Sequence, residues 1–103
     1  MEKQIFISYE PKKEYFAVRV HGDAMKNIGI IENSVVVAHK QNYAENDDII
    51  IASLNGEQII RRIKISPKAI FLTTENSDCE INPITKIDDF LILGKVVEIR
   101  TYL

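Results

Sequence analysis

The sequence is poor in cysteine, in long hydrophobic runs and in excess charge of either sign. Cys79 is the one cysteine among 103 residues, which excludes an internal disulfide and a CxxC metal site. No run approaches the roughly 18 apolar residues of a membrane-spanning helix, and Met1–Gln4 do not resemble a signal peptide. The formal net charge of −2 gives no basic footprint for nucleic acid. We therefore expect a cytoplasmic protein without cofactor, metal, membrane contact or direct nucleic-acid binding.

What the chain does contain fits one small domain. Hydrophobic residues make up 46% and charged residues 27%, which is ordinary for a globular protein. A chain of this size forms one core without staples. We expect residues 1–103 to form a single domain, with residues 1–14 as an N-terminal lead-in.

Short β-rich runs dominate the pattern. Phe16, Val18 and Val20 fall on one side of an alternating run, and residues 48–54 are apolar enough for a strand buried on both faces. Asn55-Gly56 between two such runs predicts a two-residue type I′ hairpin turn. The expected strands are residues 15–21, 34–40, 48–54, 57–65, 69–74 and 90–102.

The segments between these strands predict little helix. Residues 23–28, bracketed by Gly22 and Gly29, allow one helical turn, and residues 75–82 read as a polar loop. Gly94 is expected to mark a bend or bulge in the last strand. The sequence thus predicts an all-β fold of compact, strongly bent antiparallel sheets, or a partial barrel.

Arg61 is out of place in the strand 57–65. A period of two puts it on one face with Ile59, Ile63 and Ile65. A buried charge is costly, so Arg61 needs water, a carboxylate partner or a cleft, unless a bulge shifts the register. A lysine in such surroundings would serve as a general base, whereas a guanidinium stays protonated.

The stretch Val20-His21-Gly22-Asp23-Ala24-Met25-Lys26-Asn27-Ile28-Gly29-Ile30 resembles the nucleophile motif of the self-cleaving peptidase domain found in LexA, CI-type phage repressors and UmuD. The similarity continues through residues 37–40, 48–52, 57–64, 75–77 and 92–97, in the family's order. The resemblance implies the LexA-like peptidase fold for about residues 15–100.

The resemblance also implies that both chemical positions are replaced. The family's serine nucleophile falls on Ala24, and its lysine base falls on Arg61. In a comparable hydrolase, loss of either group costs on the order of 10⁶ in rate. We therefore expect a pseudo-peptidase without catalytic residues, whose vestigial cleft comprises Gly22, Asp23, Ala24, Met25 and Arg61.

Two other family features are missing from the printed sequence. No Ala-Gly pair precedes Ala24, so the scissile segment is not found, and no helix-turn-helix precedes the first strand. We expect the chain to lack both self-cleavage in cis and a DNA-binding domain.

The resemblance implies a function in protein–protein interaction. The family dimerises largely through its C-terminal strands, and residues 90–103 read as an apolar, edge-like segment. The expected partner is a second copy or a LexA/CI-type repressor, in SOS or prophage control, with the chain as a stand-alone antirepressor. A peptide in the vestigial cleft is a second contact mode. The candidate dimer strand comprises Phe90, Ile92, Val96, Val97 and Ile99.

Two alternatives remain. The chain is a self-cleaving repressor peptidase carrying engineered inactivating substitutions, or it is a UmuD-like accessory subunit of a DNA polymerase. The histidines give no third reading, because neither His21 nor His39 belongs to a Ser–His–Asp constellation. The adjacent acidic pairs at 47–48 and 88–89 read as solvated strand ends.

Overall fold

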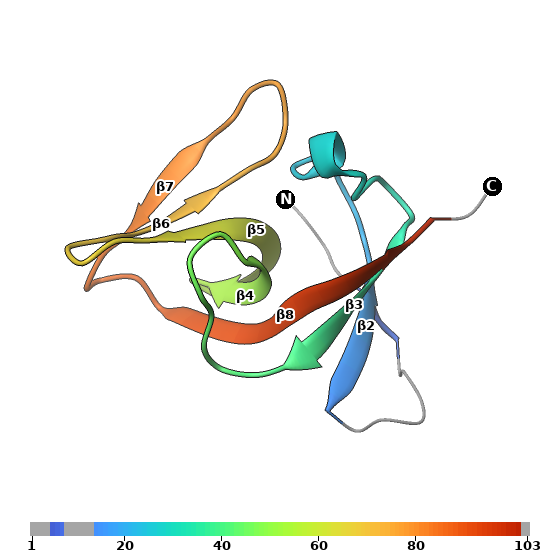
Figure 1. The fold of residues 1–103 in the computed structure, drawn as a ribbon, viewed down its shortest axis with the longest axis horizontal. Helices are drawn as coiled ribbons and strands as arrows, with labels where there is room; N and C mark the ends of the chain where they lie inside the picture. The colour runs from blue at the N-terminus through green and yellow to red at the C-terminus, as the bar shows by residue number, and fades with distance from the viewer. Residues whose placement is uncertain (1–4, 8–13, 102–103) are drawn as a thin grey trace.

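The computed structural model describes residues 5–7 and 14–101, which form one antiparallel sheet (Figure 1). The strand order is β1-β2-β3-β8-β4-β5-β6-β7, and every neighbouring pair is antiparallel. The elements are β1 (Ile5–Ile7), β2 (Tyr15–Arg19), the 3₁₀ turn η1 (Lys26–Ile28), β3 (Val35–Lys40), β4 (Ile49–Leu54), β5 (Glu57–Ile65), β6 (Ile70–Thr73), β7 (Ile81–Ile84) and β8 (Phe90–Arg100). The prediction of an all-β fold with little helix is confirmed.

The long strand β8 holds the two halves of the sheet together. Its residues 94–100 pair with β3, and its residues 90–95 pair with β4. Figure 1 shows β8 running from the half that contains β2 and β3 to the half that contains β4 to β7. The register shifts once against each neighbour, and such irregularities increase the local twist. No helix in the described part of the chain is long and apolar enough to cross a membrane.

Two core clusters lie against β4. The first contains Ile51 together with Phe16, Val18 and Val20, which confirms the alternation predicted for β2. The second contains Ile50 and Ala52 with residues of β5 and β6. Because Ile50, Ile51 and Ala52 are each 0% exposed, β4 is buried on both faces, as its apolar run predicts.

The predicted turns are present. Asn55 and Gly56 have φ values of 52° and 86°, and β4 and β5 pair up to Leu54 and Glu57, so the hairpin is confirmed. The Ser66 backbone N–H donates to the carbonyl oxygen of Ala69 at 2.9 Å and closes the turn before β6. These two turns join β4, β5 and β6 as consecutive antiparallel neighbours.

Three boundaries differ from the predictions. Residues 75–82 are not a loop throughout, because β7 starts at Ile81 and pairs with β6. The polar sequence and Pro83 conceal this strand, although proline is tolerated on an edge strand such as β7. The first predicted strand ends at Arg19, and the lead-in contains β1, while residues 1–4, 8–13 and 102–103 lie outside the described part.

The prediction that residues 90–103 form an edge is wrong for the middle of β8, where the strand has a neighbour on both sides. Phe90 and Ile92 pack against the second cluster, and Val96 packs against the first. Gly94 and Lys95 pair with both β3 and β4 and lie inside the sheet, whereas residues 90–92 pair with β4 alone. Within the described chain, residues 96–100 pair with β3 alone, so only Val97 and Ile99 of the predicted dimer strand keep an exposed position beside an open edge.

Candidate functional site

The turn after β2 carries Ala24. Gly22 and Gly29, with φ values of 91° and 90°, bracket it, and the left-handed backbone at both positions favours glycine. Met25 is buried in the first core cluster, and half-buried Ala24 packs against the same cluster. The Gly22 backbone N–H donates to Glu32 Oε2 at 2.6 Å. The predicted nucleophile-like turn is thus a rigid, anchored element.

A second loop, which follows β6, is hydrogen-bonded to this turn. The Glu75 backbone N–H donates to the Ala24 carbonyl oxygen at 2.8 Å, and the Asn27 N–H donates to the Glu75 carbonyl oxygen at 2.8 Å. The Asn76 side-chain amide donates to the Asp23 carbonyl oxygen at 3.1 Å. Segments 23–27 and 75–76, which lie far apart in sequence, therefore form one unit.

Strand β5 reaches this unit through Arg62. Arg62 Nε lies 3.4 Å from Glu75 Oε2, and both side chains are about three-quarters buried. The sequence predicts no role for Arg62, because a period of two gives its face but not a partner thirteen positions away on the loop after β6. This ion pair connects the strand of Arg61 to the turn of Ala24.

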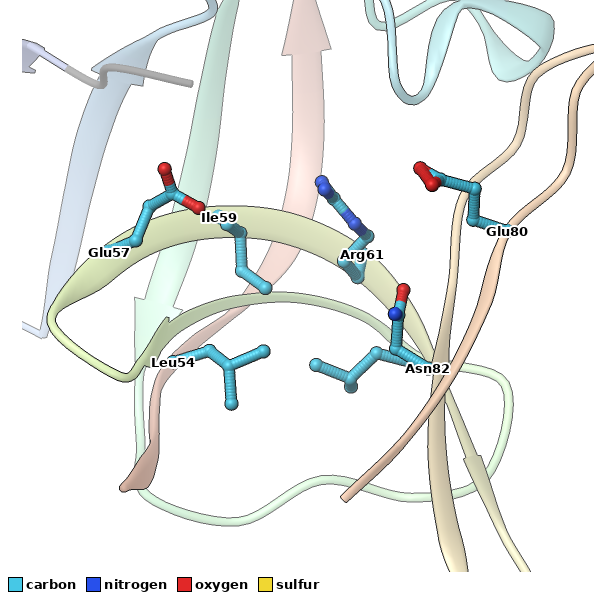
Figure 2. Close-up of a pocket in the computed structure, with 7 residues that line it drawn as sticks. Leu54, Glu57, Ile59, Arg61, Glu80 and Asn82 are labelled. Carbon is cyan, nitrogen blue, oxygen red and sulfur yellow. The ribbon is translucent and has the colours of Figure 1, made fainter. Parts of the chain in front are cut away.

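Arg61 itself faces the other way. Its Nη1 donates to the Ile60 carbonyl oxygen at 2.8 Å, and its side chain lines a pocket of about 250 Å³ beside the second core cluster. Figure 2 shows the guanidinium between the carboxylates of Glu57 and Glu80. The pocket is lined by Leu54, Glu57, Ile59, Arg61, Leu72, Glu80 and Asn82.

These two positions offer no nucleophile or base. Ala24 presents a methyl group, and a guanidinium such as that of Arg61 stays protonated and cannot accept a proton. In the described part of the chain, no group of three histidine, cysteine or acidic residues is placed to hold a metal ion. The arrangement offers hydrogen-bond donors, acceptors and charge, which suit binding.

The two histidines make local contacts. His21 Nδ1 lies 3.5 Å from Glu32 Oε1 at the base of the turn. His39 Nδ1 lies 2.7 Å from Gln41 Oε1, and its ring packs edge-to-face on Tyr15 with centroids 5.1 Å apart. The structure thus places His21 beside Glu32 and His39 between Gln41 and Tyr15.

The acidic pairs sit at the ends of strands. Lys64, which hydrogen-bonds the carboxylate, lowers the pKa of Asp47. The Thr85 backbone N–H, followed by the Asn55 side chain, lowers the pKa of Asp88. Asp47 fits the prediction of a solvated strand end, but Asp48 does not, because its side chain is only 14% exposed and its Oδ1 lies 3.5 Å from Lys95 Nζ.

The comparisons with known proteins agree with this architecture. The family model described as Peptidase S24-like matches residues 1–97. The LexA repressor of Carboxydothermus hydrogenoformans is 41% identical over 98 residues, which cover 93% of this chain and 47% of the repressor. The LexA repressor of Magnetococcus marinus is 40% identical over 85 residues, which cover 82% of this chain and 37% of the repressor. The chain thus spans less than half the length of these relatives.

Proposed function

The chain belongs to the Peptidase S24-like family, and from this premise we propose that it binds protein partners in transcriptional control without cutting them. The observation that carries the proposal is the pair of side chains at the two chemical positions, a methyl group at Ala24 and a guanidinium at Arg61. The regulatory setting comes from the relatives, which are named LexA repressors.

The chemistry of these side chains supports loss of cleavage. Peptide-bond attack by a Ser–Lys pair needs a hydroxyl and an amine that releases its proton near neutral pH. The anchored turn around Ala24 still offers backbone N–H groups, but an oxyanion site without a nucleophile leaves only a small residual rate. The fold retains a hydrogen-bonded turn around Ala24 and a pocket beside Arg61, which leave binding as an available role.

The open edge of β8 is the proposed surface for partner binding. Val97 is 51% exposed and Ile99 is 39% exposed, in the segment whose described neighbour is β3 alone. Strand β7, which is one of the two outer strands of the sheet, carries Pro83, which removes a backbone donor and disfavours strand addition there. A second copy, or the matching domain of a LexA-type repressor, would pair along residues 96–100, so the chain would act as an antirepressor.

Hydrolysis is the first test. We expect the purified chain to leave intact a peptide that contains the Ala–Gly cleavage segment of a LexA-type repressor, as followed by mass spectrometry. The double revertant Ala24→Ser, Arg61→Lys provides the comparison, because cleavage by this variant alone would show that the two side chains account for the inactivity. Cleavage by the unmodified chain, lost on altering the pocket, would refute the proposal.

Self-association and repressor binding are the second test. Sedimentation velocity should show a dimer, or a complex with an added LexA-type repressor, that Val97→Lys weakens. Leu91→Lys is the matched control, since Leu91 is also exposed on β8 but lies in the part that pairs with β4, outside residues 96–100. A monomer that binds no repressor, or equal effects of the two lysine variants, would argue against the β8 edge as the partner surface.

A further inference from the structure

We infer that a pocket on the face of β5 opposite to Arg61 binds a small neutral molecule with an apolar body and one hydrogen-bond acceptor, such as an aromatic ketone. The pocket has a volume of about 400 Å³ and is lined by Lys64, Phe71, Thr73 and Ile81, which belong to three neighbouring strands. Arg61 and Lys64 are three positions apart on β5, so their side chains point to opposite faces of the sheet. The inference goes beyond the proposed function, which involves none of these four lining residues.

The walls of this pocket are apolar. Lys64 pairs with Phe71, and Thr73 pairs with Ile81, while Phe71 and Thr73 are two positions apart on β6, so all four side chains share one face. Ile81 is 64% exposed and Phe71 is half-buried, which leaves apolar surface in contact with water. An aromatic ring that packs on these two side chains would remove that surface from water. The volume is within the range of small-molecule sites.

The charged side chains on this face of β5 already have partners. Lys64 Nζ pairs with Oδ1 of Asp47, and Arg62 Nε lies 3.4 Å from Glu75 Oε2. An anionic ligand would have to compete with two carboxylates, and a cationic ligand would have to compete with an ammonium and a guanidinium. A neutral ligand leaves both ion pairs intact, so the charges favour a neutral molecule.

Thr73 supplies the polar element of the pocket. This residue is 7% exposed, and among the residues that the structure describes its hydroxyl oxygen has no hydrogen-bond partner. The hydroxyl of the adjacent Thr74 differs, because it accepts from the Glu80 backbone N–H at 2.8 Å. A buried hydroxyl without a partner carries a desolvation cost that no hydrogen bond offsets, and rotation about χ1 turns the group toward the pocket. A ligand carbonyl would accept the hydrogen bond that Thr73 otherwise lacks.

Nuclear magnetic resonance titration of the ¹⁵N-labelled chain with acetophenone and with toluene tests this inference. Both probes carry the aromatic ring, and only acetophenone carries the carbonyl. We expect acetophenone to shift the amide signals of Phe71, Thr73 and Ile81. Thr73→Val keeps the shape of the side chain and removes the hydroxyl, so it should weaken acetophenone about two- to tenfold and leave the affinity for toluene unchanged. Because the lost hydroxyl has no partner in the unliganded chain, Thr73→Val should not lower Tm.

Variants of the wall localise the binding. Ile81→Ala should weaken both probes at least about twofold, because it removes apolar surface on which the ring packs. Ile87→Ala is the matched control, since Ile87 is 94% exposed on the turn after β7, outside the pocket, and should leave both affinities unchanged. Both isoleucines are exposed, so neither variant should prevent folding.

Three results would overturn the inference. The first is no acetophenone shift, or shifts confined to residues outside the pocket. The second is a Thr73→Val variant that binds acetophenone as tightly as the parent chain or loses both probes equally. The third is a lower Tm for Thr73→Val, which would show that the hydroxyl already has a partner. These failures are separate from failure of the proposed function, because hydrolysis and pairing through β8 are measured without either probe.

Discussion

Replacing Gly94 with alanine should destabilise the sheet where β8 passes between its two neighbours. Gly94 pairs with Lys40 of β3 and with Ile51 of β4. A Cβ atom at this position would lie 2.7 Å from the His39 carbonyl oxygen and 2.8 Å from Cε1 of Phe16. Contacts this short force a shift of the backbone of β3, of the Phe16 ring, or of both.

The expected loss in free energy of unfolding is about 1–3 kcal/mol, the usual range for overpacking a close-packed core. In a domain of this size, each 1 kcal/mol lowers Tm by about 4–8 °C. Differential scanning calorimetry should therefore show Gly94→Ala melting at least about 4 °C below the unmodified chain. Urea unfolding should show a lower midpoint with an unchanged slope.

A double-mutant cycle with Phe16→Leu tests the cause. The smaller side chain relieves the ring contact, so its cost and that of Gly94→Ala should add to less than their sum, by about 0.5 kcal/mol or more. Gly56→Ala is the control, since nothing lies within 4 Å of its added Cβ and its cost comes from a φ of 86°. Gly56→Ala combined with Phe16→Leu should be additive. Additivity of Gly94→Ala with Phe16→Leu as well, or a Gly94→Ala variant as stable as the parent, would refute the reasoning.

Other predictions concern stability and reactivity. Asp88→Asn should lower Tm at neutral pH, because it weakens the hydrogen-bond acceptor for Thr85 and Asn55. The pKa of Asp88 is lowered in the folded chain, so the difference in Tm should persist above pH 3.8 and should fade as the pH falls through the folded pKa. Calorimetry at a series of pH values measures this change. Ile60→Ala should cost about 2–5 kcal/mol in urea unfolding, because Ile60 is buried in the first core cluster; a loss below about 1 kcal/mol would contradict that packing. Cys79 should react with a thiol reagent in the folded chain without prior unfolding, because it is exposed; protection until unfolding would contradict this placement.

Local sequence signals predict the centre of the fold well. Asn55-Gly56 and the apolar run before it predict the hairpin of β4 and β5, because the turn conformation and the burial of β4 both depend on residues that are adjacent in sequence. Strand β7 escaped prediction, since Pro83 and polar neighbours weaken its signal and the strand exists only because β6 offers it an edge. The central position of β8 depends on pairing with two distant strands, which no local pattern encodes.

The site divides in the same way. A period of two places Arg61 on the face with Ile59, and the pocket is on that face. The ion pair between Arg62 and Glu75 and the place of Glu80 at the pocket both depend on how the loop of residues 74–80 approaches β5, and residue spacing carries no signal for either. Side-chain identity limits the chemistry at these positions, whereas the three-dimensional arrangement determines what they can hold.

Strands β3 and β4 follow one another in the chain, yet the last strand lies between them. During synthesis, the edges of β3 and β4 that pair with β8 therefore remain unpaired until residues 90–100 have left the ribosome. Partial chains that end before Phe90 would be open to association with one another. Because β8 is synthesised after both β3 and β4, the solubility of the nascent chain depends on the pairing of β8 with these two strands.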